Sequence, residues 1–411
     1  MTALPTRQKT EPAFVEFVVI ISLMMSLTAL SIDAMLPSLA QIGADLGVQN
    51  PNERQLIVSV LFLGLSIGQL FFGPLSDKTG RKPAIYYGFA LFIVGALISA
   101  FSTNFPIMLT GRLLQGLGIS APRAVTLALV RDRYEGRAMA RVMSFVSTVF
   151  ILIPMIAPSL GQVILLFAGW RSIFIFFIVM GLATLTWFGL RMPETLAKDK
   201  RAPFSLKRIV AATLEVVRIR SSLGYTVSAG LVSGAFIGYL NSAQQILQEQ
   251  YELGELFPIY FGVIAFSIGL ASFLNARLVM RYGMRFLVRW SLVIILALAC
   301  AGFSVAVLKA GQPPLWFLMG YLLSTFFCIG ILFGNQNSLA MKPLGHLAGV
   351  GSAVVGSLST LISMTLGTII GQSYNGTVLP AIGGLGILAV LSIFVVRWAE
   401  AGKKSRSKGN N

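Results

Sequence analysis

The sequence has few charged residues and very few cysteines or histidines. Only 11% of its 411 residues are charged, and it holds two cysteines and one histidine, whereas a soluble domain carries roughly 25% charged residues. A chain with so little charge could not cover a folded surface in water, which argues against one or more soluble domains. Cys300 and Cys328 both lie in apolar stretches, so we expect no structural disulfide.

Missing motifs exclude several kinds of chemistry. The chain has no GxxxxGK[ST] loop for nucleotide phosphates, and no run of ligand-type residues has the spacing of a metal site. It also shows no nucleophile paired with a base. We therefore expect a protein that is not an enzyme, that binds no metal and that does not hydrolyse ATP by that route.

The sequence is instead rich in long apolar runs. Hydrophobic residues make up 55% of the chain and the mean hydropathy is +0.80, and a helix needs about 20 such residues to cross a bilayer. We expect helices, because a spanning segment must satisfy its own backbone hydrogen bonds, and barrel strands would alternate in polarity. The twelve runs cover 14–42, 54–76, 83–102, 105–130, 138–166, 170–190, 222–248, 256–280, 286–308, 314–340, 347–374 and 377–398.

The net charge of +17 is explained by the placement of the basic residues. Most Lys and Arg residues fall in alternate loops, and the loops on the other side hold only Arg54, Arg171 and Lys309. This bias marks the cytoplasmic side, so both termini are expected in the cytoplasm, with the lipid bilayer and not nucleic acid as the partner. The first run lacks a signal-peptide cleavage site and is expected to be a retained helix.

The longest polar interruption, 191–222, divides the runs into six and six, which is the outline of a pseudo-symmetric transporter. GPLSDKTGRKP follows the second run and NARLVMRYGMRF follows the eighth, and aligning Gly80 with Gly283 indicates a degenerate internal repeat. The expected segments are a cytoplasmic N-terminal tail (1–13), an N-terminal six-helix half (14–192), a cytoplasmic central loop (193–221), a C-terminal six-helix half (222–399) and a basic cytoplasmic tail (400–411).

Five short stretches resemble motifs of a known family. GPLSDKTGRKP (73–83) resembles the loop signature of the major facilitator superfamily, GRLLQGLG (111–118) its motif with an intramembrane arginine, and PMIAPSLGQ (154–162) its antiporter motif. SIDAMLPSL (31–39) and VRDRYEGR (130–137) resemble the bicyclomycin-resistance and chloramphenicol-efflux (Bcr/CflA-type) drug:proton antiporters. The resemblance runs over most of the chain.

The resemblance implies an all-α membrane protein with the major facilitator fold, twelve transmembrane helices in two pseudo-symmetric six-helix halves. It also implies a monomer in the bacterial inner membrane that needs no cofactor and is driven by the proton gradient. The antiporter motif keeps Pro154, Pro158 and Gly161, but Ala157 and Gln162 stand where it usually shows glycine. These two departures leave uptake open beside export.

Asp33 is the strongest functional candidate, because an acid inside a membrane helix is costly and marks a functional site by default. Helical spacing places Ser22, Ser26 and Asp33 on one face, which we expect to line a water-filled cavity. A carboxylate balanced between desolvation and a nearby cation can load and release a proton. The alternatives are a solvated residue at the outer end of the helix and a structural helix cap.

Arg112 is the second candidate, since an arginine near mid-membrane needs a partner or water. The resemblance implies that it faces the cavity and communicates with Asp33 to couple protons. The alternative is a structural hydrogen bond to the carbonyls of a neighbouring helix. Gln115 lies one turn from Arg112, and Arg123 lies on nearly the same face closer to the cytoplasm, so its part in the cycle stays open.

The GPLSDKTGRKP turn is expected to act as a cytoplasmic latch between the two halves, and the alternative is a passive topology signal. Arg81 can pair with Asp132, and by resemblance Asp77 caps the helix that begins near His346. His346 itself is expected to be a loop residue and not a proton relay. The latch residues are Gly73, Asp77, Gly80, Arg81, Lys82 and Asp132.

A mixture of aromatic and amide side chains suggests a lining for amphipathic ligands, although ordinary helix packing explains many such residues. We therefore expect a transporter that exports small amphipathic compounds, drugs or metabolites, in exchange for protons. A proton-coupled uptake symporter, a dedicated metabolite exporter and, less favoured, a membrane sensor or enzyme are the alternatives. The expected substrate-cavity residues are Ser26, Gln115, Phe236, Tyr239, Asn241 and Asn335.

Overall fold

The computed structural model describes residues 12–407, and those residues form helices joined by short connections. Twelve of the helical segments are long and apolar enough to cross a membrane, as the apolar runs predicted. The first half contains α1 (Phe14–Asp33), α2 (Leu39–Asp45), α3 (Leu56–Thr79), α4 (Arg81–Ala100), α5 (Phe105–Arg133), α6 (Gly136–Ala168) and α7 (Arg171–Arg191). The second half contains α9 (Arg220–Gln244), α10 (Phe257–Tyr282), α11 (Met284–Leu308), α12 (Leu315–Met341), α13 (Ala348–Gln372) and α14 (Leu379–Ser407).

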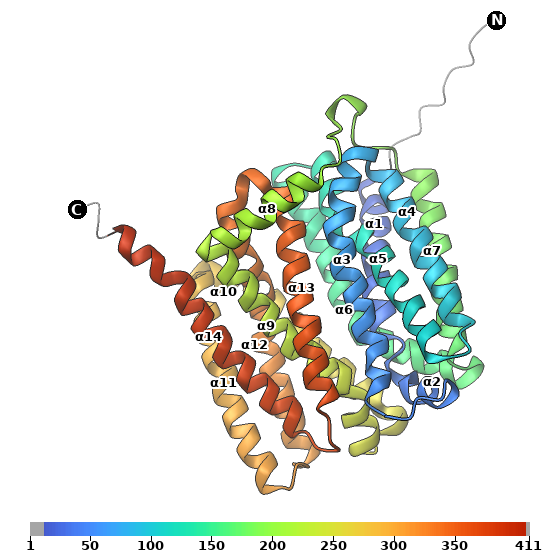
Figure 1. The fold of residues 1–411 in the computed structure, drawn as a ribbon, viewed down its shortest axis with the longest axis vertical. Coiled ribbons are helices and arrows are strands. Elements are labelled where there is room, and N and C mark those ends of the chain that lie inside the picture. Colours follow the sequence, from blue (N-terminus) through green and yellow to red (C-terminus); the bar gives the residue numbers. More distant parts are fainter. Residues whose placement is uncertain (1–11, 408–411) are drawn as a thin grey trace, which may run out of the picture.

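The helices run side by side, so that α1 begins and α14 ends at the same end of the bundle (Figure 1). We call this end the terminal face and the opposite end the far face. The short helix α8 (Leu206–Arg218) lies at the terminal face between the two halves and packs against α9 and α13. The halves meet along two long contacts, α3 with α13 and α6 with α10.

The same turn occurs once in each half. Gly80 separates α3 from α4 with φ of 106° and ψ of 163°, and Gly283 separates α10 from α11 with φ of 79° and ψ of 150°. A positive φ of this kind is readily adopted only by glycine. The backbone therefore supports the alignment of Gly80 with Gly283 that the sequence suggested, even though the residues around them have diverged.

The first apolar run corresponds to one membrane span, Phe14–Asp45, as predicted, but its helix is interrupted near the far end. The helix α1 ends at Asp33, a short 3-10 turn follows at Leu36–Ser38, and α2 then begins at Leu39. Pro37 lies inside the turn and has no N–H to continue the helical hydrogen bonds. The residues of the break are buried, and broken helices at membrane depth occur where protein or a cavity surrounds them.

Small residues let the helices of the first half approach closely. A Cβ atom added at Gly116 of α5 would lie 2.0 Å from the main-chain oxygen of Leu61 in α3. Close backbone approach of this kind replaces the hydrophobic driving force that is missing between helices in lipid. The stretch 111–118, which contains Arg112, therefore also provides the close packing of α5 on α3.

This contact gives a test of the fold. Gly116→Ala should lower the thermal midpoint in detergent, because overpacking costs about 1–3 kcal/mol. Gly320→Ala, in the second turn of α12 with no atom within 4 Å of the added carbon, is the matched control and should leave the midpoint unchanged or slightly higher. Equal midpoints for both variants would contradict the close packing of α3 on α5.

Candidate functional site

Asp33 ends α1 and is buried, with 6% of its surface exposed. Among the side chains that the structure describes, no Lys, Arg or His lies at ion-pair distance from its carboxylate. The hydroxyl of Ser26 donates to the carbonyl of Ser22 at 2.7 Å, and both residues are buried. The expected water-filled surroundings of this face are therefore absent in this conformation, because neighbouring helices cover it.

Arg112 ties three helices together through its guanidinium group. It donates to the main-chain oxygen of Ser31 in α1 at 2.8 Å and to that of Ile57 in α3 at 3.0 Å. Its third bond goes to Oε1 of Gln115 at 2.6 Å, and Gln115 in turn donates to Ser99 of α4 at 3.2 Å.

The expected cavity-facing position of Arg112 is wrong for this conformation, since its side chain is fully buried. The main-chain carbonyls satisfy a charge that would otherwise be unsolvated. This bonding matches the structural alternative that the sequence left open. The link to Asp33 runs through the carbonyl of Ser31, two residues earlier in α1.

The antiporter-like motif of α6 lies against the break after α1. A Cβ atom added at Gly161 would be 1.6 Å from the main-chain oxygen of Ala34, the residue after Asp33. Pro154 and Pro158 lie inside α6 and remove main-chain donors from that helix. Oε1 of Gln162 is buried without a hydrogen-bond partner in the described part of the chain. Asp33 therefore lies between a contact with α5 and a contact with α6.

The turn at the terminal face is organised around Arg81, whose side chain is buried. Its Nε donates to Oδ2 of Asp132 at 2.9 Å, which is the pairing that the sequence suggested. Its Nη1 donates to Oδ1 of Asp77 at 2.6 Å and to the hydroxyl of Ser76 at 2.8 Å. These bonds join α3, α4 and α5, and a cap from Asp77 onto α13 stays a prediction.

Glu194 completes this turn, and the sequence analysis did not single it out. Its carboxylate accepts from the backbone N–H groups of Arg81 at 2.8 Å and Lys82 at 3.1 Å, which neutralises the positive end of α4. Lys82 donates to the carbonyls of Gly189 and Met192 at the end of α7. A side chain at Gly80 would clash with Glu194, so the glycine is needed for space as well as for its turn.

One latch residue faces the other half. A Cβ atom at Gly73 would lie 3.6 Å from Ala353 of α13. The bonds of Asp77, Arg81 and Lys82 described above remain within the first half and its following loop. A latch that links the two halves therefore remains a prediction in this conformation.

The six expected substrate-cavity residues do not converge on one site. Phe236 and Tyr239 pack on Phe326, with ring centroids 5.7 and 4.9 Å away, while Asn335 donates to Asn275 of α10 at 2.8 Å. Ser26 and Gln115 are occupied by the bonds already described. The structure does not bring the six residues into a shared lining in this conformation, because all six make hydrogen bonds or ring contacts, and these lie in several separate places.

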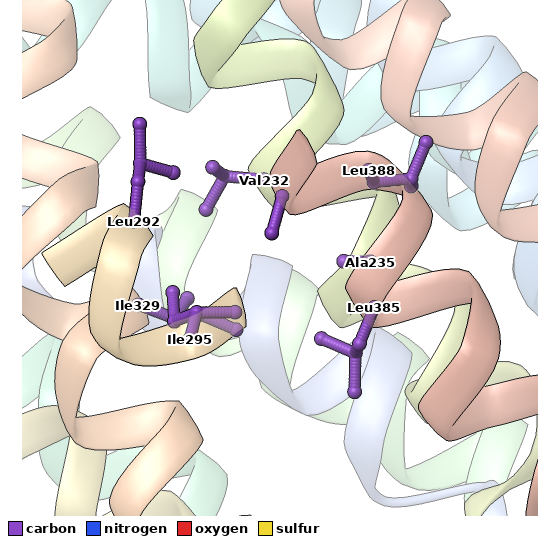
Figure 2. A pocket seen from close by; sticks show the side chains of 8 residues that line it. Val232, Ala235, Leu292, Ile295, Ile329, Leu385 and Leu388 are labelled. Atoms are coloured by element: carbon purple, nitrogen blue, oxygen red, sulfur yellow. The ribbon is translucent and has the colours of Figure 1, made fainter. Parts of the chain in front are cut away.

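Figure 2 shows a small apolar cavity inside the second half, between α9, α11, α12 and α14. Its volume is about 10 Å³, which is about the size that holds one water molecule. Its walls carry only aliphatic side chains, including Val232 and Leu385. The cavity is a packing gap and is too small for an organic ligand.

A polar network closes the far face between the halves. Arg54 forms two bonds with Glu249, at 2.6 and 2.7 Å, and Gln55 donates to Gln245. One more residue of the first half and two of the second extend the contact, and Asn241 of α9 donates to Ser59 of α3 at 3.1 Å. We call the following set the far-face clasp: Asn52, Arg54, Gln55, Gln245, Glu249, Gln372 and Tyr374.

Local backbone geometry positions one side of the far-face clasp. Gln245 and Glu249 both lie in a π-helical turn, Gln245–Gln250, at the end of α9. Such turns are rare and occur often at functional sites. Burial together with the charge of Glu249 raises the pKa of Tyr374 to about 12. Nothing in the spacing of the sequence predicted that Arg54 and Glu249 pair.

Two residues whose role the sequence left open have clear positions. Arg123 is exposed on α5, and a charged side chain at that depth requires water or a polar partner. His346 lies in a 3-10 turn before α13, and its Nε2 is 2.7 Å from Oε1 of Glu215 in α8. His346 therefore lies in a turn between two helices, as the sequence predicted, and whether it takes part in the cycle is untested.

The arrangement of two six-helix halves around broken and polar helix segments defines a membrane transporter of the major facilitator type. The chain belongs to this family, because the model of the Major Facilitator Superfamily matches residues 19–371.

Known proteins resemble the chain over most of its length. It is 27% identical over 387 residues to the bicyclomycin resistance protein homolog of Haemophilus influenzae, covering 92% of this chain and 94% of the relative. It is 30% identical over 345 residues to the multidrug resistance protein MdtL of Shigella dysenteriae, covering 79% of this chain and 80% of the relative. The crystal structure of a D-xylose-proton symporter shares the fold, with a TM-score of 0.75 and 13% sequence identity. The match covers 94% of this chain and 98% of the symporter chain. The predicted likeness to Bcr/CflA-type proteins is confirmed, and the protein is a multi-pass transporter, not an enzyme.

The far-face clasp gives a direct test by cysteine labelling. Ser59 is 2% exposed behind the clasp, so a Ser59→Cys variant without Cys300 and Cys328 should react slowly with a maleimide. Adding Glu249→Gln should raise the labelling rate about tenfold, because losing about 1.5 kcal/mol of charge-assisted hydrogen bonding shifts an opening equilibrium by that factor. Glu255→Gln, an exposed acid at the same face, is the control. Equal labelling of the two variants would show that the clasp does not hold the far face shut.

Proposed function

We propose that this protein exports small amphipathic compounds, including drugs, across a bacterial inner membrane in exchange for protons. The observation that carries the proposal is the buried, unpaired carboxyl of Asp33 at the break after α1. Because no cation pairs with it, proton uptake there breaks no ion pair. The names of two relatives, a bicyclomycin resistance protein homolog and a multidrug resistance protein, support drugs as substrates.

The proposed cycle alternates access between the two faces. The far-face clasp holds the outer side closed in this conformation. Towards the terminal face, Arg123 and Leu127 of α5 and Asn337 of α12 are exposed, which supports an opening to water there. With the terminal face in the cytoplasm, as the charge bias favours, this conformation faces inward and waits for a substrate from the cell.

The proposed halves, 14–192 and 222–399, then move against each other as parts of one monomer, with 193–221 as the cytoplasmic loop between them. The short tails, 1–13 and 400–411, also lie in the cytoplasm; most of their residues fall outside those that the structure describes. The turn with Gly73, Asp77 and Arg81 closes the cytoplasmic side in the other state. Its contacts within the first half keep the turn preformed for that step.

The proton gradient supplies enough energy for this work without a cofactor. One charge moving down 100 mV releases about 2.3 kcal/mol, which supports a concentration ratio of roughly fifty-fold. Deprotonation of Asp33 towards the cytoplasm and its reprotonation from outside would alternate with substrate binding. The carboxyl is well placed for this coupling, because Arg112 and Gly161 hold the two flanking stretches of main chain.

Uptake in symport with protons is the second candidate function. Ala157 and Gln162 replace glycines that the antiporter motif usually shows, and a structural neighbour is titled a symporter. That likeness, at 13% identity, extends to the fold alone. The direction of transport separates the two functions, since an exporter lowers and a symporter raises the amount of substrate in the cell.

Replacing Asp33 tests the proposal. In an efflux-deficient bacterium, the wild type should raise resistance to some compounds of a drug panel, and Asp33→Asn should abolish that resistance at matched expression. Asp199→Asn, an exposed acid in the central loop, is the control and should behave as wild type. Resistance that survives Asp33→Asn would remove Asp33 from the mechanism, and sensitisation by the wild type would favour uptake.

The number of acids predicts which charges the protein can carry. Within the described residues, Asp33 is the acid of the first span that has no ion pair, since Glu16 pairs with Arg191 and Asp45 with Arg171. Met25 stands two turns before Asp33, where some multidrug relatives are expected to carry a second acid. Export of a divalent cation should therefore be much weaker than export of a neutral or monovalent analogue of the same size. Efflux rates for a matched pair of dyes check this, and equal rates for both would contradict a single coupling acid.

A further inference from the structure

A large groove on the second half has no role in the proposed cycle. It has a volume of about 690 Å³ and lies between α10 and α11, with Cys328 and Ile331 of α12 forming its floor. Its walls are apolar and aromatic, among them Leu270, Phe286 and Trp290. A space of this size is large enough for an organic ligand.

The groove opens to the outside of the bundle. Phe266 is 49% and Trp290 54% exposed, and α11 packs on α12 and α14 at the edge of the second half (Figure 1). Exposed apolar side chains along two membrane-spanning helices face the hydrocarbon of the bilayer. The surroundings of this opening are therefore lipid.

The groove is longer than the hydrocarbon of one lipid leaflet is thick. From Tyr282, where α10 ends, to Phe266 the helix climbs sixteen residues, which is about 24 Å at 1.5 Å per residue. One leaflet contributes about 15 Å of the hydrocarbon thickness. The groove therefore has room for an acyl chain that enters from the terminal face and runs through the full depth of its leaflet.

The mouth of the groove at the terminal face is positively charged. Arg277 and Arg281 are exposed on the last turns of α10, and within residues 12–407 neither lies at ion-pair distance from an acid. Two further cations on the adjoining helix, Arg285 and Arg289, share the single carboxylate of Glu400. Four cations therefore face one acid here. They lie beside Tyr282, the last residue of α10, which lines this end of the groove.

We propose that this groove binds an anionic phospholipid from the leaflet at the terminal face. One acyl chain fills the groove between α10 and α11, and the phosphate of the headgroup lies against Arg277 and Arg281. Basic pockets between membrane helices are suited to anionic headgroups. A lipid with a zwitterionic headgroup would offer the same chain but would bring its own cation to this mouth.

Native mass spectrometry of the purified full-length protein tests the site. The probes are phosphatidylglycerol and phosphatidylcholine with identical acyl chains. The wild type should retain one molecule of phosphatidylglycerol in preference to phosphatidylcholine. Arg277→Ala with Arg281→Ala should lower that retention about tenfold or more, since each cation near an anionic surface contributes about fivefold. Lys198→Ala with Lys200→Ala removes the same charge from the exposed central loop and should change nothing.

Blocking the groove separates a chain site from a headgroup patch. Ser291→Phe fills the groove from α11 and should abolish retention of phosphatidylglycerol while the thermal midpoint stays within the wild-type range. Leu270→Trp blocks it from α10, should the first variant fail to fold. Retention that survives both blocks, or equal retention of both lipids by the wild type, would overturn the proposal. A lipid-free dimer that either block converts to monomer would also overturn it and assign the groove to a second copy.

Discussion

The burial of the Arg112 guanidinium inside an apolar bundle is the constraint on which the first half depends. Away from water, each of its donors needs an acceptor, and main-chain carbonyls of α1 and α3 supply two of them. Those carbonyls are reachable because α5 approaches α3 closely at Gly116. The hydrogen bonds of Arg112 and the close contact at Gly116 therefore depend on each other. The buried charge needs the nearby carbonyls as acceptors, and the small residue lets the helices that carry them approach.

The polar contacts between the halves are distributed unevenly along the bundle. At the far face the clasp joins them through an ion pair and several amides, whereas midway Ser66 and Ser357 exchange bonds between α3 and α13. Together, the contacts of the clasp and of the two serines can stabilise one conformation. Because they are few, they can all break when the halves move apart. This distribution is what a two-state transporter requires, because each state needs contacts that the other state lacks.

Much of the fold could be predicted from the sequence, and less of the site could. Hydrophobic length fixes the twelve spans, and the glycine of each turn survives as Gly80 and Gly283 because no other residue fits the backbone there. The partners of Arg112 and the pairing of Arg54 with Glu249 could not be predicted, since they join residues far apart in the chain. The break after Asp33 had a visible signal in Pro37, which the hydropathy pattern alone conceals.

The position of Asp33 explains how one proton could move whole helices. Ser31, two residues before it, accepts from Arg112 of α5, and Ala34, one residue after it, lies against Gly161 of α6. A change of charge at the carboxyl alters how favourably this short stretch is buried. Because both neighbours are held by main-chain contacts, α1 cannot adjust alone, and any shift of the stretch must be shared with α5 and α6. The broken helix is thus the element through which local protonation would bias the arrangement of the first half.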